Sequence, residues 1–326
     1  MKQPRASLDP PPGYERLNRY SRIIVDEALC RGIAVELLDP TAGEMVLSLG
    51  DRRMSTLESL SELTSAVAFR RCDHKGYTRE VFARAGLRVA EGTIATFDQR
   101  DEAFLATWHD IVVKPVRGEQ GRGITVGVVS PQELAVALAT ASATCPEVLL
   151  ERRCEGEDLR VVVIGAEVVA ASVRRAPVVV GDGASTIATL TEELSAARLL
   201  ATDGSSHVPV DDITEAVVRS AGYRLDEVLP EGTQLAVRRT ANLHTGGTIH
   251  DVTDELHPDL RAVALAAAAA VGAPVLGLDM IVPSVAGPDY TLIEANERPG
   301  LANHEPQPTV ARFVDLLFPE TARPRP

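Results

Sequence analysis

The sequence predicts an α+β fold, in which helices and antiparallel strands form separate layers. Short apolar stretches with strand character alternate with helix-like stretches along the chain. Several connections between neighbouring strands read as hairpin turns and not as crossover helices, so we do not expect a single doubly wound sheet. The chain has 326 residues, of which 45% are hydrophobic, enough for a full core and two or three subdomains in one compact unit.

The first 71 residues predict a loose tail followed by a small module of helix and strand. Residues 1–13 are rich in proline and charged, as in an unstructured tail. Apolar periodicity predicts the module over residues 14–71. Its expected elements are a helix from Tyr14 to Cys30, strands at 33–38 and 45–49, and a short helix opening at Ser59 to Glu62.

The rest of the chain predicts one larger domain over residues 72–318 and a tail at 319–326. We place a first subdomain at 72–150 and a second at 151–318, with a less periodic insertion or flap at about 176–230. Asp73 is expected to cap the first helix. The expected helices are 74–85, 131–143, 258–272 and 309–317; the expected strands are 110–115, 124–129, 147–151, a hairpin at 159–171, and a hairpin formed by 276–282 and 290–295.

Composition excludes several classes of protein. The net charge of −13 argues against a nucleic-acid-binding surface or a polybasic membrane anchor. No apolar run reaches the length of a membrane span, and the N-terminus has no signal-peptide pattern, so we expect a cytoplasmic protein. The four cysteines lack metal-binding spacing and are expected to be reduced. Cys72 precedes Asp73 and His74, but adjacent residues have poor geometry for a catalytic pair, so a structural role is favoured.

The hairpin near the C-terminus carries acidic residues that the predicted register brings together. If its turn is centred between Ala286 and Gly287, Asp279 lies opposite Glu294. Asn296 shares a strand face with Glu294, because side chains alternate along a strand. Two carboxylates and an amide oxygen suit Mg²⁺. The alternative is a pair of acids that face solvent at the mouth of a hairpin.

A glycine-rich loop with a preceding lysine predicts a phosphate site. Gly118 to Gly123 connects two predicted strands, in a G-x-x-G-x-G pattern that is neither a Walker A loop nor a dinucleotide fingerprint. Such a hairpin can fold its amides over a triphosphate, although an ordinary turn is the alternative. Lys114 ends the strand before the loop, and Lys75 lies at a predicted helix N-terminus, where a cation opposes the helix dipole.

Other charged residues suit parts of a nucleotide. Glu151 ends an apolar strand, and Asp158 follows Gly156, so these two acceptors suit the adenine amino group and the ribose hydroxyls. Arg160 and the Arg238-Arg239 pair are candidates for binding transferred phosphate. Each of these charges, taken singly, is also compatible with a solvated surface position.

In this order, these motifs resemble those of the ATP-grasp carboxylate–amine ligases. The resemblance covers roughly residues 72–318, and the combination is far more specific than any single motif. Val179 to Gly183, Arg239 to Thr248 and Asp251 to Pro258 resemble cyanophycin synthetase and the glutathione-synthetase module of fused bacterial enzymes. Ser61 to Val67 and Leu301 to Thr309 are most similar to N-acetylglutaminylglutamine synthetase.

The resemblance implies an ATP-grasp fold, in which two α/β subdomains grip ATP between them, preceded by the small N-terminal module. It implies that ATP is bound by Lys75 and Lys114 at its phosphates, by Glu151 and Asp158 at its adenosine, and under a lid that includes Gly118, Gly121, Arg122 and Gly123. It implies that two Mg²⁺ ions, or alternatively Mn²⁺, are held by Asp279, Glu294 and Asn296, with Glu294 bridging. The implied catalytic residues are Arg160, Arg239 and Asn242. Gln120 replaces the histidine of cyanophycin synthetase, and Leu278 replaces the arginine of D-alanine–D-alanine ligases.

The implied reaction forms an amide through an acyl phosphate, with an amino acid or short peptide as substrate. N-acetylglutaminylglutamine-type dipeptide synthesis, a cyanophycin- or glutathione-like addition of amino acids, and closure of side-chain amides in a peptide are the alternatives. A non-catalytic ATP-binding regulatory module is the alternative from a different class. We expect no nucleic-acid or membrane partner, and a homodimer stays open.

Overall fold

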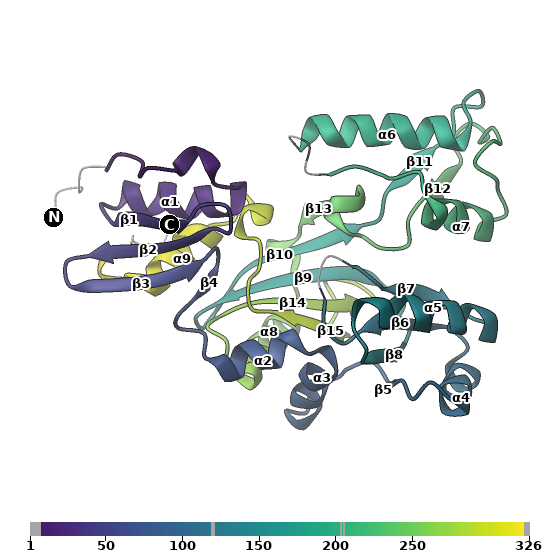
Figure 1. The fold of residues 1–326 in the computed structure, drawn as a ribbon, viewed down its shortest axis with the longest axis horizontal. Helices are drawn as coiled ribbons and strands as arrows, with labels where there is room; N and C mark the ends of the chain where they lie inside the picture. The colour runs from purple at the N-terminus through teal and green to yellow at the C-terminus, as the bar shows by residue number, and fades with distance from the viewer. Residues whose placement is uncertain (1–7, 119–120, 203, 205, 323–326) are drawn as a thin grey trace. The chain divides into compact units, whose positions relative to one another are not determined.

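The computed structural model describes residues 8–118, 121–202, 204 and 206–322, and the chain divides into two compact units (Figure 1). Unit 1 contains the described residues up to Ala90, Leu159–Ser172, and the described residues from Asp251 onward. Unit 2 contains the described residues of Glu91–Asp158 and Val173–His250. The boundaries predicted at residues 13, 71, 150 and 318 stay predictions, and 1–7 and 323–326 of the predicted tails lie outside the described residues.

Unit 1 begins with a four-stranded antiparallel sheet and one helix. Its elements are the 3₁₀ helix η1 (Tyr14–Arg16), α1 (Arg19–Cys30), β1 (Ala34–Asp39), β2 (Glu44–Leu49), β3 (Arg52–Leu57) and β4 (Leu60–Ser61), with the strands in sequential order. The prediction that a short helix begins at Ser59 to Glu62 is wrong, because Leu60 and Ser61 pair with β3. The chain turns back after β3, and this pairing satisfies the backbone groups that a helix would otherwise have bonded internally.

Two helices connect this module to the central sheet of unit 1. They are α2 (Ala66–Asp73) and α3 (Lys75–Arg84). The predicted Asp73 cap of α3 is wrong: Asp73 is the last residue of α2, and the ring of His74 accepts a hydrogen bond from the amide of Tyr77. Helix α2 extends through Asp73, so the residue that precedes α3 is His74.

A five-stranded sheet with the order β13-β10-β9-β14-β15 carries the predicted acidic hairpin. Its strands are β9 (Glu157–Ile164), β10 (Glu167–Arg175), β13 (Thr248–Asp251), β14 (Val275–Val282) and β15 (Thr291–Asn296). The predicted hairpin at 159–171 is confirmed, since β9 and β10 are neighbours across Gly165. Helix α8 (Pro258–Val271) contacts β14, and α2 and α3 contact β15. The alanines of α8 let it pack closely against the sheet.

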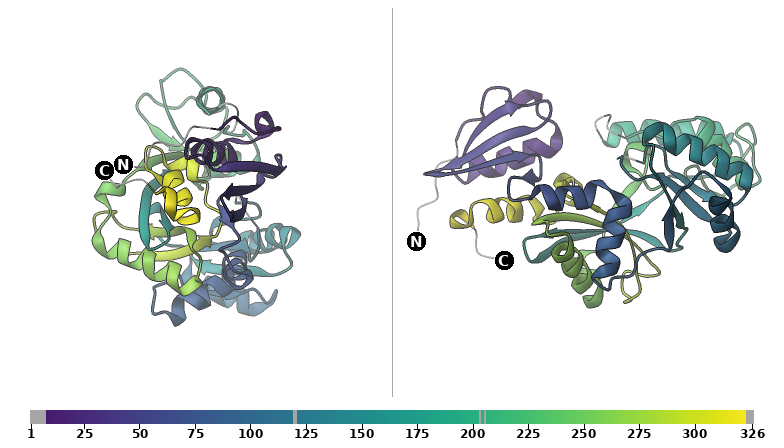
Figure 2. Two further views of the ribbon diagram at one scale, coloured as in Figure 1. Left: turned by 90° about the vertical axis from the view of Figure 1, so that its left-hand side faces the viewer. Right: turned by 60° about the horizontal axis from the view of Figure 1, so that its bottom comes forward.

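The C-terminal helix joins the first module to the sheet through a common core. Helix α9 (Thr309–Leu317) lies beside α1, and both views of Figure 2 show the N-terminal strands and helix next to this C-terminal helix. Ile24, Leu47, Val162 and Phe313 belong to one buried cluster that spans the module, the sheet and α9. The 3₁₀ helices η3 (Thr253–Glu255), η4 (Leu301–His304) and η5 (Pro319–Thr321) complete unit 1.

Unit 2 contains a four-stranded antiparallel sheet covered by helices. The sheet order is β5-β8-β6-β7, with β5 (Gly92–Ile94), β6 (Ile111–Pro115), β7 (Thr125–Val128) and β8 (Val148–Arg152). Helix α5 (Pro131–Thr144) packs on this sheet and against α4 (Gln99–Trp108). Ser130 and Glu133 form a capping box at the start of α5, which explains why the helix begins where the sequence predicts it.

The stretch predicted as an insertion, at about 176–230, shares a hydrophobic core with the residues that follow it. It contains β11 (Val178–Val180), α6 (Ile187–Ala201) and α7 (Asp212–Ser220), and it is followed by β12 (Gln234–Ala236) and the 3₁₀ helix η2 (Leu243–Thr245). β11 pairs antiparallel with β12, and Ile187, Val218 and Leu229 are among the buried residues between them and the helices. The periodicity was weak in sequence because the strands have only three residues each.

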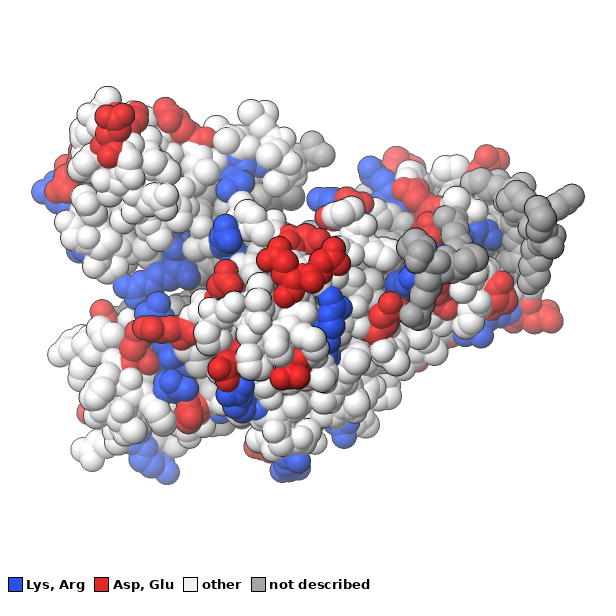
Figure 3. Space-filling view, turned by 180° about the vertical axis from the view of Figure 1, so that it is seen from behind, with Lys and Arg blue, Asp and Glu red and all other residues white. Residues whose placement is uncertain are grey.

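On the face shown in Figure 3, lysine and arginine side chains lie among acidic ones. No described helix combines the length and the apolar character that a membrane span requires.

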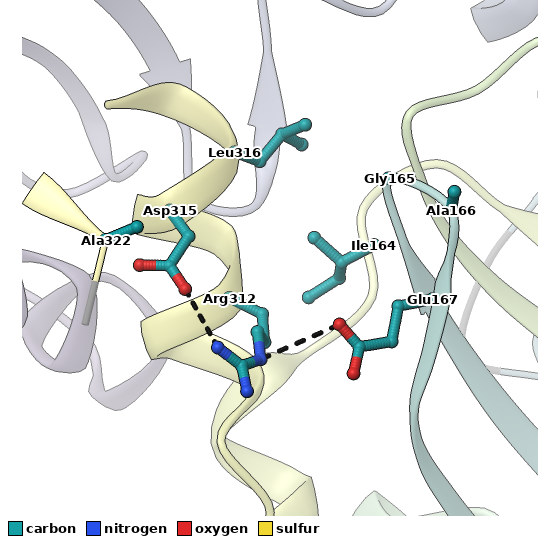
Figure 4. A pocket seen from close by; sticks show the side chains of 8 residues that line it. All are labelled: Ile164, Gly165, Ala166, Glu167, Arg312, Asp315, Leu316 and Ala322. Atoms are coloured by element: carbon teal, nitrogen blue, oxygen red, sulfur yellow. Dashed lines mark hydrogen bonds and ion pairs between the residues drawn. The ribbon is translucent and has the colours of Figure 1, made fainter. Parts of the chain in front are cut away.

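A pocket of about 330 Å³ in unit 1 is lined by Ile164, Glu167, Arg312 and Asp315, among others (Figure 4). Arg312 pairs there with both acids, and no predicted site residue lines this pocket.

Candidate active site

The acidic hairpin of unit 1 has the predicted register. Asp279 on β14 pairs directly with Glu294 on β15, and the register shifts immediately afterwards, between Asp279 and Met280. Such a bulge locally increases twist and redirects side chains. Asn296 lies two residues beyond Glu294 and donates a hydrogen bond from Nδ2 to Oδ2 of Asp279, at 3.3 Å. The two carboxylates and the amide therefore converge, as the sequence predicted.

Arg160 on β9 balances the charge of Asp279. Its Nη2 lies 2.8 Å from Oδ2 of Asp279, and its Nε donates to Oδ1, so the pair is bidentate. The guanidinium crosses β14 at Gly277, where a Cβ would lie 2.8 Å from Nη1 of Arg160 and 2.9 Å from Cβ of Pro299. Only glycine leaves room for this crossing.

Lys75 performs the corresponding role for Glu294. Its Nζ lies 3.6 Å from Oε1 of Glu294, and the lysine is buried at the first position of α3. A buried cation at a helix N-terminus is unfavourable by the helix dipole and needs an anion close by. Thus both carboxylates of the hairpin pair with predicted phosphate-binding cations.

The donor set of the hairpin suits Mg²⁺. Asp279, Glu294 and Asn296 supply oxygen ligands from two neighbouring strands, and Mg²⁺ prefers one or two carboxylates while retaining water or phosphate ligands. The amide nitrogen of Asn296 faces Asp279, so its oxygen is the atom that a cation would take. No group of three or more His, Cys, Asp or Glu with metal-binding geometry occurs among the described residues.

Unit 2 buries the other predicted cation. Lys114 on β6 pairs with Glu151 on the adjacent strand β8, and both side chains are only 3% exposed. Removal of either charge at this depth would take away the ion-pair partner of the other, which is costly in a buried position. The structure therefore pairs the predicted phosphate-binding lysine directly with the predicted adenine-binding carboxylate.

The small number of lysines in the chain also indicates which cations are special, an observation that the motifs above do not include. Only three of the 33 basic residues are lysines: Lys2, Lys75 and Lys114. Arginine supplies the remaining cations, including those of the surface. Within the described part of the chain, both lysines are buried beside a carboxylate. A compact ammonium binds phosphate as a point charge, a task that differs from the bidentate pairing of arginine.

The described residues of the glycine loop have the backbone conformations that glycine permits. Gly118, Gly121 and Gly123 have positive φ angles of 135°, 75° and 73°. A Cβ at residue 123 would lie 2.8 Å from Oγ1 of Thr144, at the end of α5. Arg122 lies between these glycines and is exposed. Glu119 and Gln120 lie outside the described residues.

Arg239 and Asn242 lie beside this loop within unit 2. Nη1 of Arg239 donates to the carbonyls of Val126, at 2.8 Å, and Gly127, at 3.2 Å. A Cβ at residue 121 would lie 3.4 Å from Nδ2 of Asn242. The predicted catalytic pair is thus brought to the glycine hairpin. Its predicted roles stay predictions.

The two remaining candidates have structural partners. Asp158, predicted to bind ribose, accepts a hydrogen bond from Arg174 at 2.7 Å. Arg238 is buried and donates to Asp211 at 2.8 Å and to the carbonyl of Pro209. Burial raises the pKa of Asp211, but the hydrogen bonds from Arg238 and from the first turn of α7 outweigh it and lower the pKa overall. Arg238 is thus bonded to the predicted insertion, and its predicted phosphate-binding role stays a prediction.

Cys72 has the environment of an inert thiol. It is buried, and burial together with the nearby Glu297, Glu294 and Asp73 raises its pKa to about 12. A thiol that stays protonated at neutral pH is a poor nucleophile. This supports the structural interpretation over the catalytic one.

Comparison with known proteins found relatives that match most of this chain. No family model matches the chain. A cyanophycin synthetase of Geminocystis herdmanii is 33% identical over 323 residues, and a glutathione biosynthesis bifunctional protein of Clostridium perfringens is 28% identical over 329 residues. These matches cover 93% and 94% of this chain, but the chain spans only 37% and 42% of the length of those relatives.

A solved structure shares the fold. A bifunctional glutathione synthetase from Pasteurella multocida superposes with a TM-score of 0.66 at 24% identity, and covers 94% of this chain and 44% of its own. The predicted α+β ATP-grasp fold is confirmed. The chain is similar to the corresponding part of cyanophycin synthetase and of the bifunctional glutathione enzymes. The similarity to N-acetylglutaminylglutamine synthetase stays a prediction.

The importance of Gly277 appears only in the structure. Its replacement tests whether the guanidinium of Arg160 passes over β14 at this position. We expect Gly277→Ala to lower the free energy of unfolding by about 1–3 kcal/mol, because the new Cβ overlaps Arg160 and Pro299. The matched control is Gly287→Ala, where the nearest atom is 3.6 Å from the new Cβ. Chemical denaturation measures both variants. Equal stability of the two would show that the close approach at Gly277 is absent in solution.

The buried ion pair Lys114–Glu151 of unit 2 predicts that the loss of one partner strongly lowers stability. Lys114→Met should lower the free energy of unfolding by about 3–5 kcal/mol, because the buried carboxylate of Glu151 loses the cation it pairs with. The double variant Lys114→Met with Glu151→Leu should recover most of this stability, since both charges are removed. Denaturation of the two variants measures the difference. A double variant as unstable as the single one contradicts the assigned pairing.

Proposed function

We propose that the chain is an ATP-dependent ligase that joins a carboxylate to an amine, with an amino acid or short peptide as substrate. The observation that carries the proposal is the opposed pair Asp279 and Glu294, each carboxylate held by a cation suited to phosphate. The relatives named cyanophycin synthetase and glutathione biosynthesis protein support this reaction class.

The proposed assignment gives each cluster one task. Asp279, Glu294 and Asn296 would hold Mg²⁺, whose chemistry when bound is to neutralise charge on the phosphates of ATP. Arg160 and Lys75 lie against these carboxylates and would stabilise the transferred phosphoryl group. Lys114 and the glycine loop of unit 2 would bind the remaining phosphates, with Glu151 and Asp158 contributing to adenosine binding.

The reaction then proceeds in two balanced steps. An oxygen of the substrate carboxylate attacks the γ-phosphorus, the bond to the β-phosphate oxygen breaks, and an acyl phosphate and ADP result. The amine nitrogen next attacks the acyl carbon, inorganic phosphate leaves, and the nitrogen loses a proton as the amide forms. The protein positions the reactants and neutralises charge. Exclusion of water by the glycine loop, the proposed lid, would protect the acyl phosphate from hydrolysis.

A lysine-directed probe tests the phosphate assignment without knowledge of the substrate. An acyl-phosphate derivative of ATP acylates lysine amines close to bound phosphates. Because the chain has only three lysines, peptide mass spectrometry assigns the label directly. We expect labelling of Lys75 or Lys114 that excess ATP prevents, and no ATP-dependent labelling of Lys2. Labelling that ATP does not prevent would remove the support for ATP binding at these lysines.

Phosphate release tests turnover. Purified protein with Mg-ATP should release phosphate when the correct pool of amino acids or short peptides is supplied. Asn296→Ala should lower this rate by about 100-fold or more, because it removes a proposed metal ligand. Thr291→Ala, on the same strand, is the control and should retain the rate.

The outcomes separate the rival functions. Phosphate release that survives Asn296→Ala contradicts the metal assignment. ATP binding without release in any pool favours either a ligase that modifies a dedicated precursor peptide or a non-catalytic ATP-binding module. Addition of candidate precursor peptides separates those two, since only the ligase responds.

A further inference from the structure

A tight turn of the N-terminal module contacts the segment that follows the acidic hairpin, within unit 1. The turn consists of Glu58 and Ser59, between β3 and β4. Glu58 has a positive φ of 51°, a conformation that is unfavourable for a residue with a side chain. Backbone strain of this kind persists where the surroundings enforce it, and it often occurs at functional sites.

The turn presents its side chains to the two residues before Gly300. The hydroxyl of Ser59, which is 2% exposed, donates to the carbonyl of Pro299 at 2.6 Å. The carboxylate of Glu58 lies 3.9 Å from Nε of Arg298 and accepts a hydrogen bond from Asn18 at 2.8 Å. The strained conformation thus allows neighbouring residues of the turn to contact Arg298 and Pro299 together.

Pro299 is enclosed from the opposite side by the acidic hairpin itself. A Cβ at Gly277 would lie 2.9 Å from Cβ of Pro299, so the ring packs directly on β14 two residues before Asp279. The same proline therefore contacts the N-terminal module through its carbonyl and the metal-binding strand through its ring. Asn296 is only three residues earlier in the chain, about 11 Å at full extension.

Helix α1 secures the rest of this segment. Arg19 donates to the carbonyl of Ala302 at 2.9 Å, and the hydroxyl of Tyr20 donates to Oδ1 of Asn303 at 3.3 Å. A Cβ at residue 300 would lie 2.8 Å from the ring of Tyr20. Together, the contacts from α1 and from the Glu58–Ser59 turn reach every residue from Arg298 to Asn303 except Leu301.

We propose that the Glu58–Ser59 turn is a positioning device for the metal-binding hairpin, and that Ser59 is a positioning residue for Asn296. The inference rests on the proposed function. The turn holds Pro299, Pro299 packs on β14, and this arrangement fixes the backbone that leads out of Asn296. Loss of the Ser59 hydroxyl releases the Pro299 carbonyl and lowers the affinity for the divalent cation, while the cation ligands themselves stay intact.

Titration with Mn²⁺ alone, followed by electron paramagnetic resonance, tests the proposal on the full chain. Ser59→Ala should raise the dissociation constant for Mn²⁺ by roughly five- to tenfold, at or below the lower end of the effect of residues that support metal ligands. The Mg²⁺ concentration for half-maximal phosphate release should rise in parallel. Ser59→Thr, which retains a hydroxyl, should restore part of the affinity, an effect that a purely structural loss does not predict.

The matched control is another buried serine of the same module. Ser61 is 5% exposed, and its hydroxyl has no hydrogen-bond partner among the described residues. Ser61→Ala should change the Mn²⁺ dissociation constant by less than about twofold. If Ser59→Ala does not fold, Glu58→Gly provides the second variant: glycine accepts the positive φ, and the loss of the carboxylate to Arg298 should raise the dissociation constant in the same direction.

The outcomes distinguish the two levels of the proposal. Equal Mn²⁺ affinity of wild type and of whichever of the Ser59→Ala and Glu58→Gly variants folds overturns the positioning role and leaves the proposed function untouched. A change in Ser61→Ala as large as in Ser59→Ala also overturns it, because the effect would then be general to the module. Absence of Mn²⁺ binding in the wild type overturns the metal assignment itself and, with it, the positioning role.

Discussion

The pairing of Asp279 with Glu294 is the constraint on which the rest of the candidate site depends. Two carboxylates on directly opposed positions repel each other unless cations or a metal compensate them. Arg160 and Lys75 provide that compensation within unit 1, from β9 and from the start of α3. The positions of α3 next to β15, and of Gly277 beneath Arg160, are thus tied to one electrostatic requirement.

The same principle organises unit 2. Lys114 and Glu151 are almost fully buried, and each is tolerated there because the other is present. Buried charge pairs contribute little net stability, since desolvation offsets most of their attraction. Under the proposed function, both lysines have a ligand-binding role, which is consistent with such pairs.

The N-terminal module contributes more to this arrangement than its sequence suggested. Its short strands and helix were predicted, but the turn at Ser59 was read as a helix start. Local periodicity carries no information about a hydrogen bond between Ser59 and Pro299, which are 240 residues apart. The same limit applies to Arg238, whose sequence position suggested phosphate binding and whose actual partner, Asp211, is supplied by the insertion.

The sequence by itself determined the elements with strong local signals and the register of the acidic hairpin. The helices predicted at 131–143, 258–272 and 309–317 agree with α5, α8 and α9, and the symmetry of a hairpin turn was enough to place Asp279 opposite Glu294. Only the tertiary structure decided which charges pair: Arg160 with Asp279, Lys75 with Glu294, and Lys114 with Glu151. The physical reason is that periodicity and turn chemistry act between near neighbours in the chain, whereas ion pairs and close packing depend on distances in space that only the complete fold defines.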